Sequence, residues 1–229
     1  MSGFQTQVNA QQAPAVAGDF ASTNPRASVV APEGGLIAGS AGVTVGRFAW
    51  IASDGKTVSN SGQGKPDGFI HREQQALIST YLAESSNLIP GGFPVTLMRT
   101  GDYYATANGS SAVKGEKTYA KLQDGSTRFE ATASAPQSAS VTAAQSGTTL
   151  TVSAVGSGAL SVGDLVTQAS GTPAYITAQL TGTPGGTGTY TLSVSQTVAS
   201  GASTATSYIE TDFVCSRASG SGELAVMSL

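Results

Sequence analysis

The sequence predicts an all-β protein, and three features of its composition and pattern indicate this class. Only 11% of the 229 residues are charged, against roughly 25% in typical globular domains. Glycine occurs 29 times and clusters with serine, asparagine and proline in short groups that are typical of turns. Apolar residues alternate with period two and nowhere sustain the 3.6-residue period of an amphipathic helix. These features together predict many short strands joined by tight turns.

The stretch at 39–81 organises the predicted fold. It contains two apolar runs, at 43–52 and 69–78, joined by a loop rich in glycine, serine and asparagine. In the first run the apolar side chains change face just before Phe48, which indicates a β-bulge because one extra residue reverses every later side chain. Trp50 is the only tryptophan, and we expect it to fill the middle of the core.

Later segments predict further strands and turns of the same sheet system. Asn108 and Gly109 form a strong signal for a two-residue hairpin. The pair Gly101 and Asp102 predicts a hinge between two strands. The remaining strands are expected at 28–30, 36–37, 94–107, 118–122, 127–130, 208–216 and 223–229.

Residues 1–26 are predicted to form an N-terminal arm. No charge appears before Asp19, and isolated apolar residues there show no period that could build a core. One interpretation is a disordered tail. The other is an extended arm that orders on a partner, with Phe4 and Phe20 as anchors.

A second module is expected at 132–207, inserted into a β body formed by 27–131 and 208–229. Between Glu130 and Glu210 the only charged residue is Asp164, and four segments alternate with period two. We therefore predict a small β-sandwich-like domain. The alternative, a low-complexity linker, does not explain the repeated aliphatic face.

Charge and hydropathy exclude two classes of partner. The net charge is −3 and the pI is about 5.0, with no run of lysine or arginine. Binding a nucleic-acid backbone requires clustered cations, so no direct contact with nucleic acid is expected. No apolar stretch approaches the roughly 20 residues of a membrane span, and the N-terminus lacks the features of a secretion signal.

The sequence predicts no enzyme and no cofactor or metal site. His71 is the only histidine and no nucleophile-elbow motif accompanies it, so a structural role is expected. One histidine and one cysteine are too few for a zinc site, and Cys215 reads as a buried thiol. The carboxylates form no calcium loop. A glycosidase needs only two carboxylates, so that class stays open as a minor alternative.

Five segments resemble the capsid cement proteins, or head decoration proteins, of tailed bacteriophages. The residues that carry the resemblance are GDFASTNPR at 18–26, GVTVGRFAW at 42–50, GFIHREQQALI at 68–78, IPGGFPVTL at 89–97, and the ending ETDF…GELAVMSL. HREQQ is the most specific piece because it is not a generic β pattern. Within the insert, LSVGDLVT and GTGTYTLSVSQTVAS resemble a small β module of phage virion proteins.

The resemblance implies that the body is a β-barrel or jelly roll. It also implies a structural virion protein that is made in the host bacterial cytoplasm and bound on the outer face of the capsid. Its partners would be the major capsid protein and further copies of itself, as a dimer or trimer. It also implies an N-terminal arm over neighbouring capsid subunits, and no catalysis. Shorter relatives run directly from one strand to the next, so Ala131 and Tyr208 are expected to lie close in space.

Candidate contact residues follow from these patterns. The candidates for the capsid or subunit interface are Phe4, Phe20, Arg26, Arg72, Glu73 and Gln74. The planar fork of Arg72 suits carboxylates and carbonyls, although pairing of Arg72 and Glu73 within the subunit is an equal alternative. A second hypothesis makes the insert a host-surface or glycan-binding module, in which exposed Tyr175 and Tyr190 stack on sugar rings.

Overall fold

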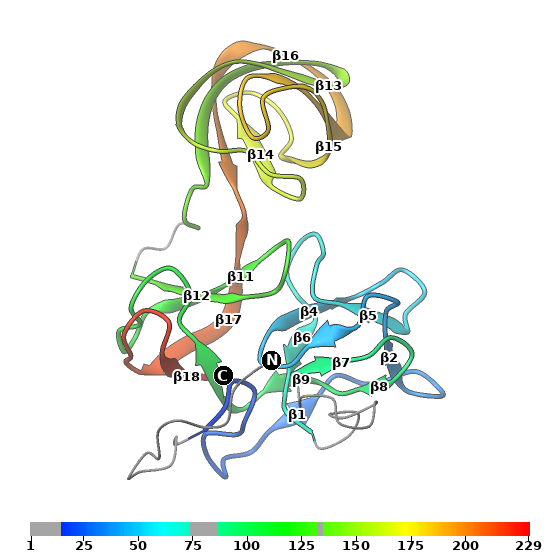
Figure 1. The fold of residues 1–229 in the computed structure, drawn as a ribbon, viewed down its shortest axis with the longest axis vertical. Coiled ribbons are helices and arrows are strands. Elements are labelled where there is room, and N and C mark those ends of the chain that lie inside the picture. Colours follow the sequence, from blue (N-terminus) through cyan, green and yellow to red (C-terminus); the bar gives the residue numbers. More distant parts are fainter. Residues whose placement is uncertain (1–14, 74–86, 132–134) are drawn as a thin grey trace, which may run out of the picture.

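The computed structural model describes residues 15–73, 87–131 and 135–229, and every regular element within them is a strand. The all-β prediction is confirmed. A small closed sheet and a five-stranded sheet form the body, and a third sheet, called the distal sheet below, stands at one end of the molecule (Figure 1).

The closed sheet is built from strands between Ala27 and Thr100. These are β1 (Ala27–Ser28), β2 (Leu36–Ala38), β4 (Phe48–Ile51), β5 (Thr57–Ser59), β6 (Gly68–Ile70), β8 (Pro94–Val95) and β9 (Leu97–Thr100). Their order is β1-β9-β6-β4-β5-β2-β8. Strand β8 lies at one end of this order and β9 near the other end, yet only Thr96 separates them in the chain. The two strands are therefore nearly continuous, and the sheet closes into a small barrel. Beside it, β3 (Val43–Thr44) pairs with β7 (Leu88–Ile89).

Strand β4 is buried on both faces because it separates two cores. Ala49 points into the barrel, in the cluster that includes Val58 and Leu97. Phe48 and Trp50 point the other way, into the cluster shared with the five-stranded sheet. A strand buried on both faces reads as a continuous apolar run, which is what the sequence shows here.

The predicted bulge before Phe48 is wrong. The chain makes a turn at Val45 and Gly46 that separates β3 from β4, two strands of different sheets. Gly46 has φ +76°, and a Cβ there would come within 2.7 Å of the Ala17 Cβ. The change of face therefore marks a change of sheet.

The five-stranded sheet has the order β10-β18-β17-β11-β12. Its strands are β10 (Asp102–Thr106), β11 (Lys117–Lys121), β12 (Thr127–Glu130), β17 (Tyr208–Arg217) and β18 (Leu224–Ser228). The predicted hinge at Gly101 is confirmed, with φ +129° between β9 and β10. The predicted Asn108-Gly109 hairpin is wrong, because β10 pairs with the C-terminal β18. Asn108 instead donates from its backbone and side chain to the Thr127 carbonyl.

The distal sheet comprises β13 (Ala139–Gly158), β14 (Leu165–Gln168), β15 (Ala174–Gly182) and β16 (Gly188–Thr206). The long β16 pairs with all three others. The end of β13 returns beside its own beginning, where Ser153 Oγ donates to the Thr142 carbonyl at 3.2 Å. The sheet thus curls around its own apolar core (Figure 1), which includes Leu150, Ile176 and Tyr190.

The route between body and distal sheet differs from the expected one. Strands β12 and β17 flank β11 and are both antiparallel to it, so they run parallel and need a crossover connection. Glu130 lies opposite Lys117, whereas Tyr208 lies opposite Lys121, an offset of four residues or about 13 Å along the sheet. The expectation that Ala131 and Tyr208 lie close together is therefore wrong.

The two chain segments meet higher up, at the foot of the distal sheet. Thr206 Oγ1 donates to the Pro136 carbonyl at 2.7 Å, and Ser138 N donates to the Ala205 carbonyl at 2.8 Å. The first rung of the β13–β16 ladder, Ala139 opposite Ala205, follows directly.

Two buried glutamines of the distal sheet are expected to respond oppositely to substitution by methionine. Gln168 is 6% exposed and its amide atoms have no hydrogen-bond partner among the described residues, whereas the Gln145 amide bonds Gly147, Val194 and Gln196. Gln168→Met should raise the free energy of unfolding by about 1 kcal/mol because it removes unpaired buried polar atoms, and Gln145→Met should lower it by about 1–3 kcal/mol. Thermal melts compare the two; a clear loss in the Gln168 variant would contradict the assigned packing.

Candidate interaction surfaces

Residues 15–26 lie against the body at the end away from the distal sheet (Figure 1). Gly18 N donates to the Tyr104 carbonyl at 2.8 Å, and Tyr104 N donates to the Asp19 carbonyl at 3.0 Å. The segment therefore extends the edge of β10. The prediction of a free arm reaching Arg26 is wrong for these residues, while residues 1–14 lie outside the described part of the chain.

Phe20 is the centre of a layered cluster of side chains. Its ring stacks on His71 with centroids 4.8 Å apart, and it contacts Tyr103 at 5.5 Å. The Arg26 guanidinium lies 3.8 Å from the Phe20 centroid, within the range of a cation–π contact. Phe20 also packs against the aromatic core, so a residue predicted to anchor a partner first anchors its own segment.

Two side-chain contacts complete this group. Arg72 Nη1 lies 3.3 Å from Asp19 Oδ1, and His71 Nε2 lies 2.6 Å from Glu73 Oε1. Arg72 and Glu73 are thus both paired within the subunit, though not with each other. We define the basal cluster by its members, which are Asp19, Phe20, Arg26, His71, Arg72 and Glu73.

The structure brings together four of the six predicted interface residues, namely Phe20, Arg26, Arg72 and Glu73. Phe4 and Gln74 lie outside the described residues. Sequence reasoning missed Asp19 as the partner of Arg72 and gave His71 only a structural role. The run at 18–26, which carries part of the family resemblance, contains Asp19, Phe20 and Arg26. The run at 68–78 carries another part and contains residues 71–73. Their shared resemblance was the signal that could have indicated contact between the two runs.

Asp102 fastens the segment between Phe20 and Arg26. Its carboxylate accepts hydrogen bonds from Ser22 Oγ at 2.5 Å and Asn24 Nδ2 at 2.6 Å. The hydrogen bond from Ser22, followed by those from Ser228 and Asn24, holds the pKa of Asp102 below its usual value. Because the folded-state pKa is lowered, these bonds stabilise the segment above the unfolded pKa of about 4.

Acid should therefore loosen this segment. As pH falls from 5 through the lowered pKa of Asp102, protonation weakens the bonds from Ser22 and Asn24, and amide exchange in 20–26 should quicken relative to β11. Asp102→Asn should show faster exchange already at pH 6 and a weaker dependence on acid. Equal protection of 20–26 before and after protonation of the Asp102 carboxyl, which its NMR carbonyl shift reports, would contradict this anchoring.

A buried carboxylate joins the distal sheet to the body. Asp164 is 0% exposed and accepts hydrogen bonds from Gln123 Nε2 at 2.8 Å and Ser207 Oγ at 2.5 Å. Ser161 N and Ser138 Oγ donate to its second oxygen at 2.8 and 3.3 Å. Its donors come from the β11–β12 turn, both connecting segments and the distal sheet itself, so this one side chain fixes all of them.

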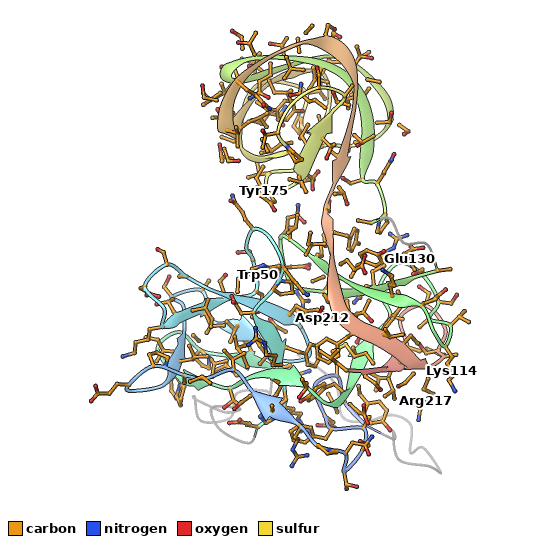
Figure 2. All side chains as sticks on the ribbon, turned by 180° about the vertical axis from the view of Figure 1, so that it is seen from behind. Trp50, Lys114, Glu130, Tyr175, Asp212 and Arg217 are labelled. Carbon is orange, nitrogen blue, oxygen red and sulfur yellow. The ribbon has the colours of Figure 1, made fainter. Side chains whose placement is uncertain are left out.

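A second contact braces the same joint. Tyr175 lies at the lower edge of the distal sheet, facing the loop beside Trp50 (Figure 2). Its hydroxyl accepts a hydrogen bond from Gly64 N at 2.8 Å, and Trp50 Nε1 donates to the Gly64 carbonyl at 2.9 Å. Gly62 packs against Trp50 so closely that a Cβ there would lie 2.2 Å from the indole. The joint is therefore specified by contacts on both sides.

The two tyrosines predicted to stack on sugars are not free to do so. Tyr190 is 1% exposed, and its hydroxyl donates to the Gly186 carbonyl at 2.6 Å. Burial raises its pKa. Its expected exposure is wrong, because it faces the interior of the curled sheet. Tyr175 is half-buried and its hydroxyl is engaged by Gly64.

Chemistry-bearing groups are dispersed over the part of the chain that the structure describes. Nowhere in 15–73, 87–131 or 135–229 do three His, Cys, Asp or Glu side chains gather as metal ligands. No helix in these ranges could span a membrane. Cys215 is buried, and burial raises the pKa of its thiol.

The described residues thus form a barrel, a five-stranded sheet and a distal sheet, with the basal cluster at the first two. Over residues 4–162 the chain matches the family described as XM1 gp53 minor capsid protein. The match covers more than two thirds of the 229 residues, so the chain belongs to this family and is a structural protein of a bacteriophage capsid. No curated protein sequence matches it. The match ends within the distal sheet and not at the predicted boundary near Ala131.

Removal of the Phe20 ring should test the basal cluster. Phe20→Ala should lower the free energy of unfolding by about 2 kcal/mol, less than for a fully buried phenylalanine, and should release residues 15–26 in hydrogen exchange. Truncation of residues 1–14 is the matched control and should leave the melting temperature almost unchanged. A Phe20→Ala variant as stable as the unsubstituted protein would show that the ring packs elsewhere.

Proposed function

We propose that this protein decorates the outer face of a phage capsid and cements the contacts between major capsid subunits. In this arrangement the basal cluster faces the shell and the distal sheet projects outward. The observation that carries the proposal is the position of segment 15–26, which holds three members of the basal cluster, at the end of the body away from the distal sheet (Figure 1). The capsid family supplies the setting.

The chemistry of the basal cluster suits a protein–protein contact. Arginine and aromatic residues are enriched at the centre of interfaces, and Arg26 and Phe20 are stacked together here. The Arg72 and Asp19 side chains are 39% and 29% exposed, so both can exchange partners on docking. Exposed Val30, at 93%, follows β1 and adds apolar surface near this end.

The distal sheet has the opposite character. Asp164 is its only charged residue, and that carboxylate is buried in the joint. The exposed surface of the described part, 135–206, is therefore uncharged and presents mainly hydroxyl and backbone groups. Such a surface offers little electrostatic steering toward a shell, which favours a projecting position. A braced joint holds it in a fixed direction.

Cementing by this geometry depends on many weak contacts. Each copy would bind modestly, and attachment at repeating positions of the lattice would raise the overall stability of the shell through avidity. The glycan-binding alternative gains no support from the described aromatic residues of the distal sheet, because Tyr190 is buried and Tyr175 is engaged in the joint.

Neutralising the basal arginines should weaken shell binding. Arg26→Gln with Arg72→Gln should reduce occupancy on undecorated shells at least tenfold, measured by co-sedimentation, because two contact cations are lost. The matched control replaces Lys56 and Lys114 by glutamine and should bind normally, because their side chains have no hydrogen-bond or ion-pair partner among the described residues. Full occupancy of the arginine variant would refute docking through the basal cluster.

The distal sheet should be dispensable for binding. Replacing residues 140–204 by Asn-Gly closes the Ala139–Ala205 rung with a two-residue hairpin and keeps the natural crossover from β12. This variant should fold, bind shells and protect them from heat. The comparison is a variant with Ala131 joined directly to Tyr208, which should not fold because it cannot span the crossover. If the hairpin variant folds but fails to bind, the distal sheet belongs to the shell contact.

A further inference from the structure

Strand β1 leaves one side of its backbone open. It stands at one end of the order β1-β9-β6-β4-β5-β2-β8, so among the described residues it has a neighbouring strand only on the β9 side. Ser28 lies opposite Met98, and Val29 N donates to the Leu97 carbonyl at 2.8 Å. Because the backbone groups of successive residues in an antiparallel ladder point to opposite sides, the amide and carbonyl of Ser28 face the open side.

The chain beyond this bond continues the open side. The backbone groups of Val30 and Ala31 form no hydrogen bond with any described residue. Ser28, Val30 and Ala31 are exposed, Val30 at 93%. Residues 27–31 contain neither a charged residue nor a proline, which are two of the devices that keep an exposed strand edge from pairing with another chain. Residues 28–31, called the open edge below, are therefore available for pairing.

A hollow borders the open edge. It has a volume of about 350 Å³, and its lining comes from 28–31, 35–36 and 94–97, none of which is charged. Val29 packs its side chain against the barrel core, whereas Val30 and Pro94 are exposed at the rim. A strand added along the open edge points every second side chain to the same face. One apolar side chain of such a strand can therefore enter the hollow.

The charges around the open edge favour an uncharged partner segment. The Lys56 ammonium lies beside the turn that carries Glu33, 3.4 Å from the place of a Cβ at Gly34, so these two charges offset each other. On the other side, the Arg26 guanidinium is stacked on Phe20. In strand addition the main-chain hydrogen bonds give affinity and pockets for alternate side chains give specificity. An extended, uncharged segment with one large apolar side chain meets both requirements.

The position of β1 favours a capsid subunit as the source of this segment. Strand β1 follows residues 15–26 directly and lies with them at the lower end of the body (Figure 1). A second copy paired through the same edge would extend from β1 in the opposite direction, into the space that the shell occupies in the proposed orientation. Because the chain belongs to a capsid protein family, the shell itself is the partner that this edge would meet.

We propose that an extended, uncharged segment of the major capsid protein pairs with the open edge as an added strand and places one apolar side chain in the hollow. The inference rests on the proposed decoration of a shell and names the kind of partner segment that the base of the protein would bind. A few hydrogen bonds form per copy, so each contact is weak and its repetition over the lattice supplies the overall attachment.

Proline at position 30 tests the backbone pairing. Val30→Pro removes an N–H that has no partner among the described residues, and proline is tolerated at an open strand edge, so the melting temperature should change little. Co-sedimentation with undecorated shells should fall about tenfold, because an added strand loses a hydrogen bond and meets the proline ring. Val30→Thr keeps the N–H and the branched shape and should bind normally. Equal binding by the two variants would overturn strand addition.

Photo-cross-linking identifies the partner with the backbone unchanged. A benzophenone side chain in place of Ser28 is irradiated on decorated shells, and the products are analysed by mass spectrometry. We expect links to the major capsid protein, and none from the same group in place of Thr177, which is exposed on β15. Links from position 28 only to another copy, or no link, would overturn the assigned partner. Failure of the unsubstituted protein to co-sediment would instead count against the proposed decoration itself.

Discussion

The packing of four aromatic rings between the barrel and the five-stranded sheet is the interaction on which the body depends. Phe48 and Phe69 come from the barrel, and Tyr103 and Phe213 from the sheet, with neighbouring centroids 5.3–6.1 Å apart. Burial raises the pKa of Tyr103 to about 12, and its hydroxyl donates to the Thr100 carbonyl. These rings lie at the centre of the core that binds the barrel and the five-stranded sheet into one body.

The basal cluster and the joint with the distal sheet are both attached to this layer. Toward the base, Phe20 packs on Tyr103 and carries His71 and Arg26 with it. Toward the distal sheet, Trp50 belongs to the same core and holds the loop that bonds Tyr175. A continuous path of packed side chains thus runs from the basal cluster to the joint. This arrangement suits the proposed decoration of a shell, because packed side chains connect both ends to one core.

Much of the fold could be predicted from local pattern, and the failures have physical causes. Alternation and turn chemistry gave the strand class and the hinge at Gly101. The bulge before Phe48 was misjudged because a change of sheet and a bulge both reverse the face of later side chains. The Asn108-Gly109 signal was overridden by long-range pairing of β10 with the C-terminal β18. Strands β12 and β17 run parallel because each pairs antiparallel with β11. No local sequence pattern encodes these two long-range pairings.

The candidate site was predicted in part for the same reason. Phe20, Arg26, Arg72 and Glu73 could be named from residue type and family resemblance, but their convergence depends on residues 18–21 pairing with β10. The exposure of Tyr190 was predicted wrongly because alternation divides the side chains of a strand between two faces without showing which face is buried. Asp164 was recognised as the lone charge, yet its role in the joint requires donors that come from separated segments of the chain.

Hydrogen exchange on free and shell-bound protein tests the central claim, the orientation on the capsid, most directly. The arrangement described here predicts added protection on binding in residues 15–30 and 70–73, with amides of β13–β16 unchanged. Added protection confined to the distal sheet, with the basal residues exchanging as in the free protein, would contradict it.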